Sequence, residues 1–180
     1  MDDVITRFLN STAGSVPALD LLAIWAGKLG VPILVALVAI QWWSRIDRLH
    51  VRHAGLSAGL SFLLGLGINQ IIIAVIHRVR PYDAGITHLI VEKSADWSFP
   101  SDHATASVSI AAAFALQRLP LRTALFALVA LVVCLARVYV GTHYVSDVLA
   151  GALVGICAAV LVKLLFRENS RIDRLATRIF

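Results

Sequence analysis

The chain has 180 residues, of which 59% are hydrophobic and only 15% are charged, and its formal net charge is +5. Its mean hydropathy of +0.83 excludes an ordinary soluble globular domain and predicts a chain that lies in lipid. Arginines and lysines gather in short loops and near the C-terminus rather than along one exposed face, so nucleic-acid binding is not expected.

Long hydrophobic segments follow one another along the chain, at residues 16–43, 54–76, 104–116, 121–140 and 145–166. At about 20 residues per crossing, the length accommodates roughly five or six helices, so we expect an all-α membrane bundle forming a single domain over residues 1–180. Lys28, Gly30 and Pro32 interrupt the first segment, which predicts that its first half lies in the interface while residues 31–43 cross. Segment 104–116 is the weakest span by hydropathy.

The basic residues predict the orientation of the bundle. By the positive-inside rule the loops after the first and third segments and the C-terminal region are cytoplasmic, which leaves the N-terminus, the loop 77–103 and the turn 141–144 outside. His50 and His53, in the first basic loop, are expected to be solvated. The arginines from 167 to 178 are expected to lie against anionic lipid on the inner face.

Polar side chains interrupt the apolar chain at three places, each at the outer end of a predicted helix. The groups are Arg78-Val79-Arg80-Pro81, then Pro100-Ser101-Asp102-His103, then Arg137 with His143 and Asp147. Arginine guanidinium suits bidentate contact with phosphate oxygens. Taken alone, however, the first group fits arginines that extend toward lipid headgroups better than a site.

The second and third groups point to chemistry at an anion. Ser101 is placed to cap the third helix, whose first-turn amides then face any anion above them. His103 there is suited to protonate a leaving oxygen, or is merely an interfacial histidine. His143 and Asp147 are four residues apart and share a helix face, so the carboxylate can orient the imidazole, a candidate nucleophile.

Together these residues predict phosphoryl transfer without a metal or other cofactor. His103, His143, Asp102 and Asp147 include the side-chain types of a metal site, but neighbouring arginines repel a cation and attract an anion. Phosphate is therefore the favoured ligand.

The three groups resemble the type 2 phosphatidic acid phosphatase superfamily, whose signature is Lys-x6-Arg-Pro, Pro-Ser-x-His and Arg-x5-His-x3-Asp, in that order. The resemblance implies a six-helix-type membrane bundle, related to the vanadium haloperoxidase core, and a phosphohistidine mechanism. In that scheme His143 attacks phosphorus, Asp147 orients it and His103 protonates the leaving group. Arg80, Arg137 and the Ser101 region hold the phosphate oxygens.

The chain departs from this signature at Ile73, where the family has lysine. His77, one turn beyond on the same predicted face, and the adjacent Arg78 are the expected replacements for that phosphate contact, with Lys93 in the outer loop a remoter one.

The expected partners are the lipid bilayer and a membrane-bound lipid phosphate; the oligomeric state is not specified. The aspartate in Pro-Ser-Asp-His and the small size resemble the bacterial undecaprenyl-diphosphatase branch, which implies hydrolysis of undecaprenyl diphosphate outside the inner membrane during carrier-lipid recycling. Phosphatidate and phosphatidylglycerophosphate remain alternatives. A transporter or a non-catalytic lipid-phosphate binder is the competing class, although transport sites usually lie near the midplane and not at one rim.

Overall fold

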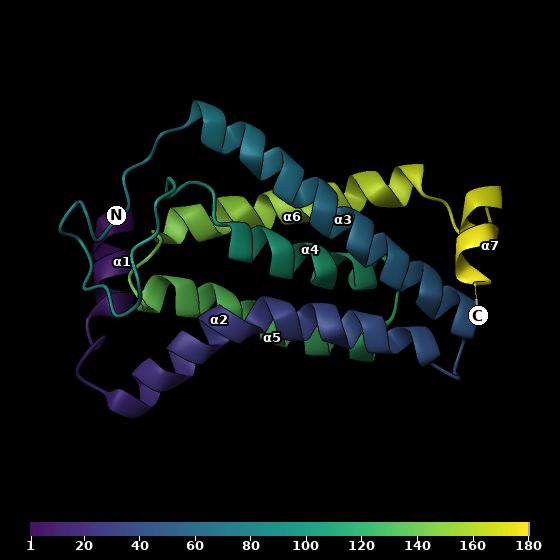
Figure 1. The fold of residues 1–180 in the computed structure, drawn as a ribbon, viewed down its shortest axis with the longest axis horizontal. Coiled ribbons are helices and arrows are strands. Elements are labelled where there is room, and N and C mark those ends of the chain that lie inside the picture. The colour runs from purple at the N-terminus through teal and green to yellow at the C-terminus, as the bar shows by residue number, and fades with distance from the viewer. Residues whose placement is uncertain (180) are drawn as a thin grey trace.

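The computed structural model describes residues 1–179, which form helices and connecting loops without strands. The helices are α1 (Asp2–Asn10), α2 (Pro17–Ile40) with the 3₁₀ turn η1 (Gln41–Trp43), α3 (Arg48–Val75), α4 (Asp102–Leu116), α5 (Pro120–Tyr139), α6 (Val145–Leu165) and α7 (Arg171–Thr177). Figure 1 shows a long bundle with α1 and the loop between α3 and α4 at one end and α7 at the other. The predicted all-α membrane bundle is confirmed.

Four of the helices in the described chain are long and apolar enough to cross a membrane: α2 with η1, α3, α5 and α6. Their outward faces carry large aliphatic side chains such as Leu63, Leu128 and Leu153, each more than half exposed. A surface of this kind is stable in hydrocarbon and not in water. The chain is therefore a multi-pass membrane protein.

Helix α4, the segment with the weakest hydropathy, lies in the middle of the bundle and packs against α3, α5 and α6. Two glycines of α6 allow this close approach. A Cβ added to Gly151 would lie 2.5 Å from the carbonyl oxygen of Ser101, and one added to Gly155 would lie 2.7 Å from the carbonyl oxygen of Thr105. Because protein surrounds α4, its small and hydroxylated residues do not have to face lipid.

The first segment is one continuous helix, α2, from Pro17 to Ile40, so Lys28, Gly30 and Pro32 do not interrupt it. Gly30 allows α2 to lie directly against α5, where an added Cβ would come 2.2 Å from Val133 Cγ2. Pro32 lies inside the helix without ending it, as neighbouring helices commonly permit within membranes. In Figure 1 the first part of α2 runs at an angle to the rest, as expected for a helix with an internal proline.

The expectation that His53 is solvated is also wrong. Helix α3 begins at Arg48, so His53 lies within it and is fully buried, with Nδ1 2.8 Å from Asp173 Oδ1 of α7. Arg52 donates to the carbonyl oxygen of Thr177 at 2.8 Å. The buried carboxylate of Asp173 and the carbonyl oxygen of Thr177 therefore attach the C-terminal helix α7 to α3.

Candidate active site

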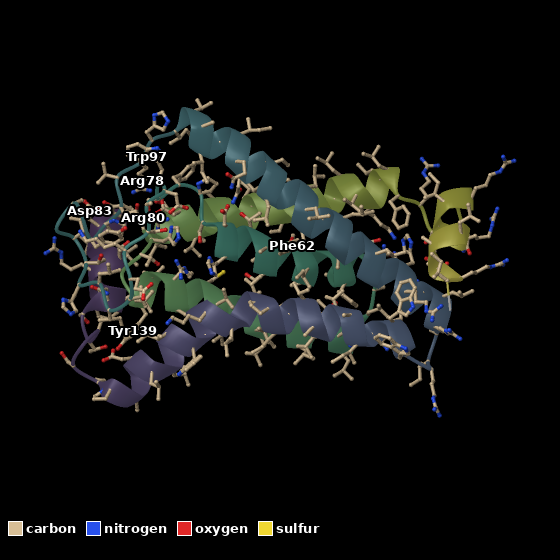
Figure 2. All side chains as sticks on the ribbon, in the orientation of Figure 1. Phe62, Arg78, Arg80, Asp83, Trp97 and Tyr139 are labelled. Atoms are coloured by element: carbon tan, nitrogen blue, oxygen red, sulfur yellow. The ribbon has the colours of Figure 1, made fainter. Side chains whose placement is uncertain are left out.

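A small cavity of about 90 Å³ opens at the end of the bundle that carries α1. It is lined by Arg80, Ser94, Asp96, Trp97, Pro100, Asp102, His103, Arg137 and His143. Figure 2 shows Arg80 and Trp97 at this end. At least one member of every predicted motif therefore reaches the same space, although the loop after α3, helix α4 and most of α5 separate the motifs in sequence.

Arg80 is almost fully buried and connects the outer loop to the turn before α6. Its Nε donates to the Asp96 carbonyl oxygen at 3.0 Å and its Nη1 to the Thr142 carbonyl oxygen at 2.9 Å. Its Nη2 contacts the Asp96 carboxylate at 2.8 Å. Burial opposes ionisation of Asp96, but the hydrogen bond from Ser94 and the charge of Arg80 hold its pKa below the ordinary value. The cavity therefore contains a carboxylate as well as its cations.

His143 has one tautomer that fits its surroundings. Its Nδ1 lies 2.9 Å from the carbonyl oxygen of Ser98, which can only accept, so Nδ1 carries the hydrogen and Nε2 keeps its lone pair. Nε2 lies 3.4 Å from Arg80 Nη1, on the cavity side. Burial, reinforced by the charges of Arg137 and Arg80, lowers the pKa of His143 to about 4 against the opposing effect of Asp147. At neutral pH the ring is therefore uncharged, which is the state in which an imidazole nitrogen can act as a nucleophile.

Asp147 supports His143 through Ser98 more than through a direct hydrogen bond. Its Oδ2 lies 3.6 Å from His143 Nδ1, but it accepts from the Ser98 hydroxyl and, at 2.9 Å, from the Tyr144 amide. Ser98 therefore uses its carbonyl for the imidazole and its hydroxyl for the carboxylate. Sequence reasoning missed Ser98, because no motif spacing marks this loop residue.

Arg78 and His77 do not line the cavity, in contrast to the expectation that either replaces the motif lysine. Arg78 Nη1 contacts Asp147 Oδ1 at 2.6 Å and its Nη2 contacts Asp2 Oδ2 at 2.7 Å. His77 is exposed and packs on Trp97, with ring centroids 5.0 Å apart. Helix α3 ends at Val75, so the helical spacing that placed His77 on the face of Ile73 does not continue.

Ser101 is at the N-cap of α4, but its hydroxyl makes no cap hydrogen bond and has no partner among residues 1–179. The expectation that its side chain caps α4 is therefore wrong. Its amide instead donates to the Asp147 carbonyl oxygen at 3.1 Å, which ties α4 to α6. The first-turn amides of α4 remain free for an anion, as at most helix starts. His103, in that turn, lines the cavity.

Arg137, near the end of α5, also faces the cavity. Its Nε is buried and has no hydrogen-bond partner within the described chain. A buried guanidinium nitrogen without an acceptor is costly, and an incoming phosphate oxygen would satisfy it. No group of three or more His, Cys, Asp or Glu side chains in the described residues is arranged to hold a metal ion.

A fold of this kind, with histidines and arginines converging at one membrane rim, defines a membrane phosphatase. Residues 54–171 match the PAP2 superfamily, and the chain belongs to that family. It is 33% identical to the undecaprenyl-diphosphatase BcrC of Bacillus subtilis over 156 residues, which cover 86% of this chain and 69% of that one. It is also 33% identical to phosphatidylglycerophosphatase B of the same organism over 119 residues, covering 58% and 56% of the two chains.

Among solved structures, the chain is similar to a transmembrane PAP2-type phosphatidylglycerolphosphate phosphatase from Bacillus subtilis. The TM-score is 0.70 and the identity 26%, over 94% of this chain and 86% of that one. The predicted family, fold and hydrolase class are therefore confirmed.

Proposed function

We propose that this protein is a metal-independent lipid diphosphatase that converts undecaprenyl diphosphate into undecaprenyl phosphate and orthophosphate. The observation that carries the proposal is the position of His143 Nε2, with its lone pair, beside a cavity that His103 and two arginines also line. The similarity to an undecaprenyl-diphosphatase supports the choice of lipid.

The chemistry follows from these positions. His143 Nε2 attacks the terminal phosphorus, and the bond from that phosphorus to the bridging oxygen breaks. His103 gives a proton to the departing lipid phosphate. Burial and the charges of Arg137, His143 and Arg80 lower the pKa of His103 to about 3, so the negative charge of the bound phosphate has to raise that pKa for His103 to carry the proton. Arg80, Arg137 and the first-turn amides of α4 stabilise the charge on the transferring phosphoryl group. Water then attacks phosphorus, releasing orthophosphate and restoring the neutral imidazole.

The cavity is proposed to face the extracytoplasmic side. Its support is the distribution of arginines: the opposite end of the bundle carries Arg45 and Arg118 in loops, Arg48 at the start of α3, and the basic α7. A cysteine introduced at Glu92, in the loop beside the cavity, should react with a membrane-impermeant thiol reagent in intact cells. Protection until the cells are opened would reverse the assignment.

Phosphatidylglycerophosphate is the second candidate substrate. The similarity to phosphatidylglycerophosphatase B and to the solved phosphatidylglycerolphosphate phosphatase supports it. The two lipids differ in the group that leaves: a lipid monophosphate in one case and a glycerol oxygen in the other.

The test is phosphate release by the purified full chain from undecaprenyl diphosphate, phosphatidate and phosphatidylglycerophosphate, with and without a chelator. We expect the diphosphate to be the best substrate, activity to survive chelation, and His143→Ala to abolish it. His77→Ala is the matched control, a histidine at the same end but outside the cavity, and should keep full activity. Absence of release from every lipid would favour a non-catalytic binder or a transporter, and loss of activity with chelator would contradict the metal-independent mechanism.

A further inference from the structure

A second cavity, of about 250 Å³, lies beside the catalytic one. The two share Ser94 and Arg137 in their linings. The second cavity is bounded on its other side by Ile24, Gly27 and Lys28 of α2. It therefore extends from the phosphate-handling residues toward a helix whose outer face meets lipid.

Lys28 is a lone cation within a membrane-spanning helix. It is exposed, and its neighbours Trp25 and Leu29 are exposed apolar side chains of the same helix. It makes no ion pair or hydrogen bond with the residues that the structure describes. A charged residue within a membrane helix is costly, and it generally marks a site for an ion, a substrate or a partner group.

The other two lysines of the chain have partners. Lys93, which lines the same cavity, contacts the Asp83 carboxylate at 2.9 Å, and Lys163 at the far end donates to Gln117 Oε1 at 2.6 Å. Extension of Lys28 toward the headgroups would account for its location in the helix. It would not account for its place in the lining of a cavity that continues to Arg137.

Arg137 forms the wall between the two cavities. An added Cβ on Gly27 would lie 3.5 Å from Arg137 Nη1, so the α2 backbone passes next to the guanidinium. Arg137 Nε has no acceptor among residues 1–179. A guanidinium that borders both spaces can bind oxygens of two linked phosphates at once. Glu92 also lines the second cavity, and its negative charge opposes the attraction of a phosphate by the cations there.

We propose that the second cavity holds the lipid-proximal phosphate of a diphosphate headgroup, with Lys28 as the cation that recognises it. The terminal phosphate then lies at His143, Arg137 bridges the two, and the lipid chain leaves along the apolar face of α2. This proposal rests on the proposed diphosphatase function. In the reaction the phosphorus–oxygen bond between the two cavities breaks, and the lipid monophosphate departs from the side of Lys28.

The consequence is selectivity between headgroups. Lys28 would stabilise the phosphate that becomes the leaving group, which exists in a lipid diphosphate and not in a lipid monophosphate such as phosphatidate. A lysine that donates a charge-assisted hydrogen bond to a phosphate increases the rate or affinity roughly 10- to 100-fold. Lys28→Met, which keeps an apolar stem of similar length, should reduce kcat/KM for a prenyl diphosphate by about that factor and leave phosphatidate hydrolysis nearly unchanged.

The experiment measures phosphate release from undecaprenyl diphosphate and from phosphatidate by the wild type and by the Lys28→Met, Lys28→Arg and Lys163→Met variants. Lys28→Arg should keep the preference for diphosphate. Lys163→Met is the matched control, a lysine of the membrane-spanning helix α6 that lies outside both cavities and donates to Gln117, and should behave as the wild type. Thermal unfolding in detergent checks that each variant folds.

Two results would overturn the proposal and leave the proposed function in place: equal losses on both substrates, or no loss with Lys28→Met. A wild type that releases no phosphate from undecaprenyl diphosphate would instead refute the proposed function from which this proposal starts.

Discussion

Replacement of Arg78 by alanine tests whether this arginine positions the catalytic groups or binds substrate. Asp147 is fully buried, and Arg78 Nη1 provides one of its hydrogen bonds at 2.6 Å. A hydrogen bond to a charged group contributes about 1.5–3 kcal/mol. Since the Arg78 side chain is 30% exposed, solvent weakens the pair and we expect a stability loss near the lower end of that range.

The effect on activity should appear in kcat. Arg78 does not line the cavity, so its loss should leave KM within about twofold and lower kcat roughly 10-fold, through a less well-placed Asp147, Ser98 and His143. Asp2→Asn, which removes the other carboxylate on Arg78 at 2.7 Å, should have the same pattern with a smaller loss. Arg78→Lys should recover part of kcat.

The assay is steady-state phosphate release from undecaprenyl diphosphate, together with thermal unfolding of each variant. His77→Ala controls for disturbance of the segment that follows α3. A marked rise in KM with unchanged kcat for Arg78→Ala would refute this reasoning, since that pattern belongs to a residue that contacts the substrate phosphate.

Three further predictions concern other charges. Because burial lowers the pKa of His143 to about 4, its imidazole is neutral above that pH. Protonation of His143 should therefore lower kcat/KM only as pH drops through about 4, and a loss on acidification centred at the ordinary histidine value of 6.5 would contradict this. Asp96→Asn removes a carboxylate that competes for Arg80, so orthophosphate should inhibit this variant several-fold more strongly; weaker inhibition would mean that Asp96 mainly positions Arg80. Asp173→Ala leaves His53 buried without its partner and should lower the free energy of unfolding by about 2 kcal/mol with kcat unchanged, measured by thermal unfolding and turnover; an equal Tm would show that the pair does not hold α7.

Hydropathy and charge predicted most of the bundle because only long apolar helices are stable where their side chains face lipid. The segments 54–76, 121–140 and 145–166 correspond closely to α3, α5 and α6. Hydropathy was misleading where protein and not lipid surrounds a helix: α4 is weakly apolar because its neighbours enclose it. The expectation that Gly30 interrupts the first segment was also wrong, because Gly30 is a packing contact between α2 and α5.

The site was predictable as far as side-chain chemistry and short spacing reach. Arg80, His103, Arg137 and His143 all line one cavity, as motifs at the same rim of a bundle must. Ser98 and Asp96 were not predictable, because their positions depend on the path of the long outer loop over the cavity. His77 was misplaced because the prediction extended helical periodicity past Val75, beyond the end of α3.

The two arginines of the cavity have different hydrogen-bond partners, which suggests a division of roles. Arg80 already donates to the carbonyl oxygens of Asp96 and Thr142 and contacts the Asp96 carboxylate. A phosphate at His143 must therefore displace or share those partners, and much of Arg80's contribution is to hold the outer loop against the turn that carries His143. Arg137 keeps a buried Nε without an acceptor, so phosphate binding there displaces no protein partner from that nitrogen. Since charge-assisted bonds are strongest where nothing has to be displaced, Arg137 and the α4 amides, more than Arg80, should determine how tightly the phosphoryl group is held.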